Sequence, residues 1–152
     1  MPQNKVTHIK RIDWNKLNLS PEVNIAAQVI TKDIIDGIGS GKDIDGRAFH
    51  PLAESTKRQK KRRGYPLTPL WAKGMMKGVY VKPHATKARP EAKVQVPKGR
   101  DGVNRIVVGV VHNTGDGLPK REWYGVGKRV QKKLRKEMKL RLNKKLKIGK
   151  AI

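Results

Sequence analysis

The sequence contains no cysteine. This excludes disulfide bonds, thiolate metal sites and a cysteine nucleophile. Long apolar runs are also missing. None approaches the roughly 20 residues that a membrane-spanning helix needs, and residues 1–20 lack the continuous apolar core of a signal peptide. We therefore expect a soluble chain that is made and kept in the cytoplasm.

Acidic and aromatic residues are scarce. The 152 residues include 12 Asp and Glu against 36 Lys and Arg, which gives a formal net charge of +24, and aromatic residues make up 5%. Because charges of one sign repel within a small chain, this excess favours contact with a polyanion. Nucleic acid is the first partner that such a composition indicates. An acidic protein surface, or burial among acidic neighbours in an assembly, satisfies the same charge.

The chain still has enough apolar residues to fold. Its hydrophobic fraction is 36%, and apolar residues recur at helical and strand spacing, which indicates a modest core. We divide the chain into an N-terminal arm (1–19), a single α+β domain (20–148) and a C-terminal tail (149–152). The arm is polar with isolated apolar residues. It is either a partly ordered tail or a strap that docks on a neighbouring subunit.

Two helices bound the predicted domain. The first begins at Ser20, a good N-cap that is followed by Pro and Glu, and it ends in the glycine-rich stretch Gly37–Gly41. The last runs from about Gly127 to Leu146, where five apolar residues recur every four positions and form one stripe.

Shorter elements are predicted between these helices. We expect a basic helix from Leu52 to about Arg63 and one or two helical turns from Leu70 to Met76. Three segments with strand patterns are Gly78–Val81, Ala92–Val96 and Arg105–Val111. The third is rich in β-branched residues, so we expect both of its faces to be covered.

No group of residues organises a reaction. Gly39-Ser40-Gly41-Lys42 lacks the first Gly and the final Ser/Thr of a phosphate-binding loop, and it follows a helix instead of opening one. Asp43, Asp45 and Glu54 match three positions of a calcium loop, but Ala48 stands where that loop requires Gly. The four His residues are scattered, and the GxSxG nucleophile motif is absent. We predict no enzyme activity, no cofactor and no metal site.

Positive charge is concentrated in two segments, the basic helix and the final helix. On the final helix, like charges lie four residues apart, as in Lys128/Lys132 and Arg135/Lys139, and such pairs repel. We expect an anionic partner to relieve them. Aromatic residues are not interleaved with these cations, which argues against single-strand recognition by base stacking. The predicted contacts to DNA or to an acidic partner are Lys57, Arg58, Lys60, Lys61, Arg62, Arg63, Lys128, Arg129, Lys132, Lys133, Arg135, Lys136 and Lys139.

The order of several short motifs is distinctive. An opening helix is followed by Asp45-Gly46-Arg47-Ala48-Phe49-His50-Pro51-Leu52, then by a basic stretch and Pro66-Leu67. Near the end, Val110-Val111-His112-Asn113-Thr114-Gly115 precedes Leu118-Pro119-Lys120-Arg121-Glu122-Trp123-Tyr124-Gly125 and a helix. Over about residues 20–146, this order resembles the bacteriophage virion-morphogenesis and tail-completion families, which include small neck and tail-component proteins.

The resemblance implies a small α+β domain, in which an antiparallel sheet of about three to four strands is flanked by the early and the long C-terminal helix. It also implies a non-enzymatic structural role in a virion, at the head–tail junction, as a tail-completion, tail-terminator or head–tail joining protein. It implies a ring of copies, with sixfold symmetry expected, and contacts with connector, adaptor or tail-tube proteins. Double-stranded DNA in the lumen is a further expected partner, and assembly takes place in the host cytoplasm.

The resemblance also points to a loop at the subunit interface. The residues of this loop are His112, Gly115, Pro119, Arg121, Trp123 and Tyr124. The two aromatic residues either pack in the core or lock the loop onto the domain or onto an adjacent subunit. The alternative function, based on charge alone, is a basic nucleic-acid-binding protein that is ribosome-associated or packages DNA.

Overall fold

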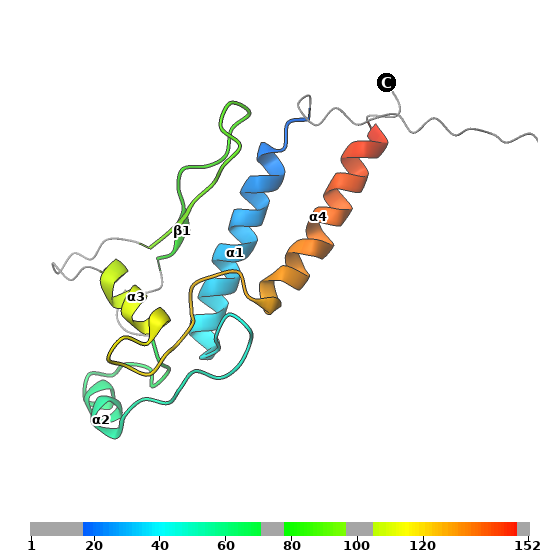
Figure 1. The fold of residues 1–152 in the computed structure, drawn as a ribbon. Helices are drawn as coiled ribbons and strands as arrows, with labels where there is room; N and C mark the ends of the chain where they lie inside the picture. Colours follow the sequence, from blue (N-terminus) through cyan, green and yellow to red (C-terminus); the bar gives the residue numbers. More distant parts are fainter. Residues whose placement is uncertain (1–16, 71–77, 97–104, 149–152) are drawn as a thin grey trace, which may run out of the picture.

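The computed structural model describes residues 17–70, 78–96 and 105–148. Within these ranges it has four helices and a two-stranded antiparallel sheet (Figure 1). The predicted α+β class is therefore confirmed. Most of the predicted arm, the tail and the helical turns expected from Leu70 to Met76 lie outside the described residues.

Helix α1 (Ser20–Ser40) begins and ends close to the predicted positions. Ser20 is its first residue and not its cap, since Leu19 occupies the cap position. The Asn18 side-chain oxygen instead accepts hydrogen bonds from the Ser20 N–H at 3.1 Å and from its hydroxyl at 2.6 Å. The helix ends at Gly41, whose φ of 69° is left-handed, a conformation that glycine adopts without steric cost.

Helix α4 (Lys128–Ile148) confirms the long final helix, and it lies alongside α1 (Figure 1). The carboxylate of Asp45 accepts the Lys128 backbone N–H at 2.9 Å, so a distant loop supplies the cap of this helix. The preceding Gly127 is buried against Ile44, and a Cβ on it would lie 2.2 Å from the Ile44 carbonyl oxygen. Only glycine allows the chain to enter the helix at this point.

Helix α2 (Glu54–Arg62) confirms the predicted basic helix. Strands β1 (Tyr80–Val81) and β2 (Val94–Gln95) lie within two of the three predicted strands. They pair antiparallel, with Tyr80 opposite Gln95 and Val81 opposite Val94.

The strand predicted from Arg105 to Val111 is wrong, because this segment belongs to helix α3 (Arg105–Thr114). The sheet of the described residues therefore has two strands, and not three or four. The reason is tertiary. The Gly109 carbonyl accepts the Trp123 indole N–H at 2.9 Å, and the Asn113 side chain accepts two backbone N–H groups of the same loop. A helix places positions 109 and 113 on one face, and these contacts override the β preference of the valines.

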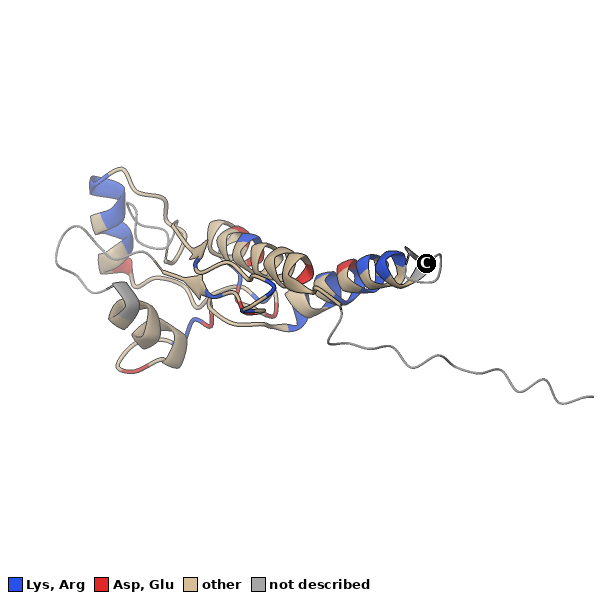
Figure 2. Ribbon diagram, turned by 90° about the horizontal axis from the view of Figure 1, so that it is seen from above, with Lys and Arg blue, Asp and Glu red and all other residues tan. Residues whose placement is uncertain are grey.

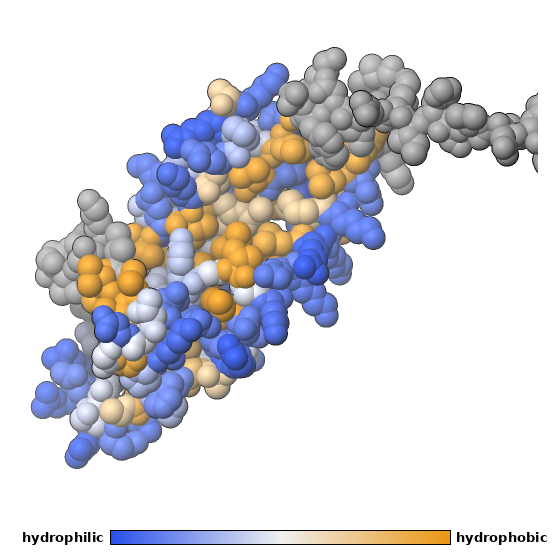
Figure 3. All heavy atoms as spheres, in the orientation of Figure 1, coloured by the Kyte–Doolittle hydropathy of each residue, from blue (hydrophilic) through white to orange (hydrophobic). Residues whose placement is uncertain are grey.

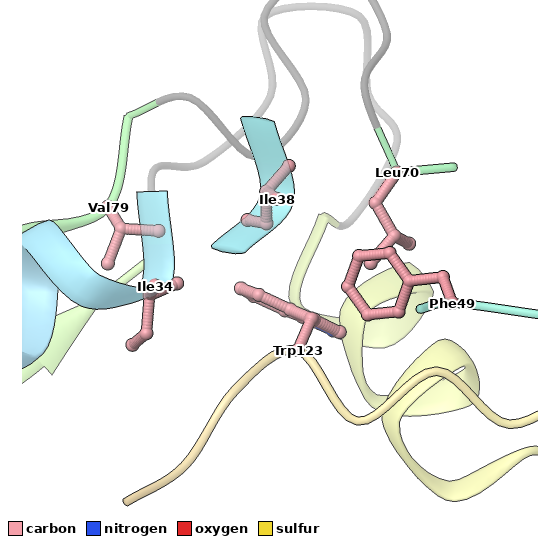
Figure 4. Packing of buried hydrophobic residues seen from close by; sticks show 6 residues of the cluster. All are labelled: Ile34, Ile38, Phe49, Leu70, Val79 and Trp123. Atoms are coloured by element: carbon pink, nitrogen blue, oxygen red, sulfur yellow. The ribbon is translucent and has the colours of Figure 1, made fainter. Parts of the chain in front are cut away.

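The core lies between α1, α3 and the loops that join the helices (Figure 4). Trp123 projects toward the centre of this cluster, with Ile34 and Ile38 of α1 on one side and Phe49 and Leu70 on the other. All are under one-tenth exposed. Burial of such side chains stabilises each by roughly 1.5–3 kcal/mol, so one tryptophan joins segments that are far apart in the sequence.

Candidate polyanion-binding surface

Two groups of cations lie on α4, and the first faces α1. Asp33 of α1 is only 4% exposed and accepts hydrogen bonds from Arg129 Nε at 2.9 Å and Lys133 Nζ at 2.7 Å. Gly37 leaves room for this pair, because a Cβ there would lie 2.5 Å from an Arg129 guanidinium nitrogen. Two predicted partner contacts, Arg129 and Lys133, therefore bind an acid of the same chain.

A second ion pair joins the other ends of the two helices. Lys145 Nζ lies 2.7 Å from a carboxylate oxygen of Glu22, and it also donates to the Asn18 carbonyl. Burial alone raises the pKa of Glu22, but the hydrogen bond from Lys145 and the charges of Lys145 and Arg141 outweigh it, so the pKa lies below its usual value. The sequence predicts that anions neutralise the cations of the final helix. Two of these anions, Asp33 and Glu22, belong to α1 of the same chain.

The second group of α4 cations faces solvent, and we call it the α4 basic stripe. These side chains are exposed, and the described structure gives none of them an ion pair. At 100° per residue they fall within an arc of about 100° on the helix surface. Figure 2 shows Lys and Arg along α4 and over α2. The stripe consists of Lys128, Lys132, Arg135, Lys136 and Lys139.

Helix α2 carries a smaller exposed group, made of Arg58, Lys61 and Arg62, with Arg63 directly after the helix. The two other predicted contacts on α2 are used within the fold. Lys57 pairs with Glu54 at 2.6 Å. Lys60 is 9% exposed and donates to the Thr68 carbonyl at 2.7 Å, and burial, together with the charge of Arg121, lowers its pKa.

The predicted interface loop is bound to its own domain. Arg121 is 5% exposed and donates to the carbonyls of His50 at 3.1 Å and Pro51 at 3.2 Å. Burial lowers the pKa of Arg121, and burial together with the Arg121 charge lowers the pKa of the adjacent His112. This guanidinium connects the loop after α3 to the loop before α2.

The two aromatic residues of this loop have different environments. Trp123 is 4% exposed and belongs to the core. Tyr124 is 38% exposed, and its hydroxyl donates to the Val94 carbonyl of β2 at 2.7 Å. Of the alternatives considered above, Trp123 therefore packs in the core, and Tyr124 locks the loop onto the domain. Gly115 allows the turn after α3, with a φ of 82°, while Pro119 accepts a hydrogen bond from Arg121 at 3.4 Å.

An uncharged pocket of about 490 Å³ lies between the β1–β2 hairpin, α3 and the loop. In Figure 3 hydrophobic atoms gather on the face that carries α3. Two of the residues that line the pocket, Tyr80 and Val110, are 40% and 54% exposed. The residues that line it are Tyr80, Val94, Gln95, Val96, Gly109, Val110, Asn113, Thr114, Trp123 and Tyr124.

The acids that match a calcium loop have other roles. Asp43 accepts the backbone N–H groups of Asp45 and Arg47 at 3.0 and 2.8 Å, and Asp45 caps α4. In the part of the chain that the structure describes, no group of three or more His, Asp or Glu is placed to hold a metal ion. No helix there is long and apolar enough to cross a membrane.

Several residues of this site were missed by the sequence analysis. Asp33 lies beside the apolar residues Ile30 and Ile34 in a chain with few acids, and this placement is a usable signal for a buried ion pair. Asn113 and Gly127 carry no such signal, because their roles depend on segments that are distant along the chain or on close backbone approach.

We compared the chain with protein-family models, with curated proteins and with solved structures, and none of the three comparisons gives a match. The resemblance to phage tail-completion proteins therefore rests on the order of motifs in the sequence.

Proposed function

We propose that this chain is a non-enzymatic structural protein of a tailed-phage virion, which acts at the head–tail junction in tail completion, tail termination or head–tail joining. The observation that carries the proposal is the meeting of its two characteristic motifs. Arg121 of the later motif donates to His50 and Pro51 of the earlier one, and Phe49 and Trp123 belong to one core cluster. Motifs about 70 residues apart thus form a single structural unit.

In this proposal, copies of the chain form a ring, with six copies expected. Two chains of charge +24 repel wherever their basic surfaces meet. The uncharged surface around Tyr80, Val110 and Tyr124 is free of this repulsion, which makes it the favoured place for contact between copies. The N-terminal arm is the second proposed contact, as a strap on the neighbouring subunit.

The other proposed partners are the connector or adaptor and the tail tube, and the chain is located in the virion after assembly in the host cytoplasm. Purified infectious particles should therefore contain the chain in a fixed copy number, measurable by quantitative mass spectrometry. Its absence from such particles would contradict the proposal.

A charge reversal tests the basic surface in the same setting. Lys132→Glu with Lys136→Glu should block virion joining while the monomer stays folded, because both side chains are exposed and lie outside the described ion pairs. Lys133 is left unchanged, since it binds Asp33. Normal infectious particles from the double variant would argue against a role for this surface.

A second candidate, a ribosome-associated or DNA-packaging protein, is favoured by the net charge of +24. It predicts that the isolated monomer stays bound to nucleic acid at physiological salt. Ring formation without such retention supports the structural role instead.

A further inference from the structure

We propose that the α4 basic stripe binds the phosphate backbone of double-stranded DNA and does not read base sequence. This inference rests on the proposed function, because it names the partner of the basic surface in a ring around DNA. It commits to α4 as the contacting element and to a duplex as the occupant.

Counter-charge is distributed unevenly around α4. On the side that faces α1, Arg129 and Lys133 share the buried Asp33, and Lys145 binds Glu22. The adjacent, solvent-facing arc of the helix holds five exposed cations, with no carboxylate within ion-pair distance in the described structure. Since neighbouring like charges on a helix repel, an anion bound from outside the described structure would relieve this arrangement.

The side chains of the stripe indicate the chemical class of that anion. Four of the five stripe residues are Lys, and the exposed Leu140 lies to one side of their arc. The centres of protein–protein interfaces are depleted in Lys and depend on aromatic or other large anchors. Lys side chains act as point charges toward phosphates. The composition of the stripe therefore favours a phosphate backbone over an acidic protein.

The length of the stripe also suits a duplex. Lys128 and Lys139 are separated along the helix axis by about 16 Å. A duplex carries one phosphate per roughly 1.7 Å of its axis, so the same length presents about ten phosphates to five cations. The stripe thus meets more charge than it needs. Base edges are read mainly by Arg, Asn and Gln side chains. The stripe has one Arg and no Asn or Gln, so we expect binding that is independent of base sequence.

The experiment measures binding of the full chain to a labelled 30-base-pair duplex by fluorescence anisotropy, as a function of salt. Five phosphate contacts give a slope of about −4.5 in log affinity against log salt concentration, which is about a 500-fold loss from 50 to 200 mM. Replacing Lys132, Lys136 and Lys139 by Gln should reduce the slope to about −1.8. Circular dichroism verifies that the variant is folded.

The matched control removes three charges from α2, by Arg58→Gln, Lys61→Gln and Arg62→Gln, and should leave the slope near −4.5. Equal losses from both triple variants would show diffuse attraction to the whole chain and would overturn the proposal. Competition by poly-glutamate as strong as competition by duplex DNA would also overturn it, in favour of an acidic protein. These measurements use the isolated chain and test DNA binding by the stripe. The proposed function is tested separately, by the presence of the chain in purified particles.

Discussion

The ion pair at Asp33 makes a quantitative prediction about how α4 is held on α1. Asp33→Asn removes the carboxylate charge and keeps the shape of the side chain. Removing one partner of a buried ion pair costs about 3–5 kcal/mol. Here the side chains of Arg129 and Lys133 are 21% and 54% exposed, so water recovers part of the lost interaction. We expect a loss of about 2 kcal/mol in the free energy of unfolding.

Urea denaturation followed by circular dichroism measures this loss. With an m-value of about 2 kcal/mol/M, the midpoint should fall by about 1 M. Asp36→Asn is the matched control, because Asp36 lies on the same helix, is exposed and makes no ion pair in the described residues. It removes the same charge and should shift stability by less than about 0.5 kcal/mol. Equal shifts from the two variants would refute the reasoning, since net charge alone would then explain both.

Three further predictions concern other contacts. Gly127→Ala should lower stability by about 1–3 kcal/mol, because the added Cβ would overlap the Ile44 carbonyl, and an unchanged melting temperature would contradict this close approach. The lowered pKa of Glu22 contributes stability above the usual Glu pKa of 4.5, and this contribution is lost as the pH falls through the lower folded-state value. Acid titration of unfolding should therefore show a steeper loss below pH 4.5 in the wild type than in Lys145→Gln, and parallel curves would exclude the pair as the cause. Arg121→Lys should cost about 1–3 kcal/mol by thermal unfolding, because one ammonium cannot reproduce the fork of donors that binds two carbonyls of the earlier loop, whereas wild-type stability would show that the clamp is dispensable.

The long helices could be predicted because their signals are local. Pro21 and Glu22 mark the start of α1, Gly41 marks its end, and α4 has an apolar stripe over five turns. The segment that became α3 could not be predicted, since a short run of valines has no readable period. Its helical form depends on contacts of Gly109 and Asn113 with Trp123, which lies 14 and 10 residues further along the chain.

The candidate site was predicted in part for a similar reason. The sequence shows that the cations of the final helix need anions, but it does not show which of them have one within the chain. Asp33 is 96 and 100 residues away from Arg129 and Lys133. Only the packing of α4 on α1 separates these internally paired cations from the exposed stripe.

These long separations have a consequence for the order of synthesis. The contacts that hold α4 join residues 83 to 127 positions apart, from the Asp45 cap to the hydrogen bond between Lys145 and Asn18. During synthesis, α1 therefore leaves the ribosome well before α4 has been made. Until then, Asp33 has neither Arg129 nor Lys133 as a partner. Distant pairings of this kind form slowly, because the intervening chain must first be closed into a loop. The final helix is thus the element that completes the fold, and shortened chains that lack it leave Asp33 without its two cations and expose an apolar face of α1.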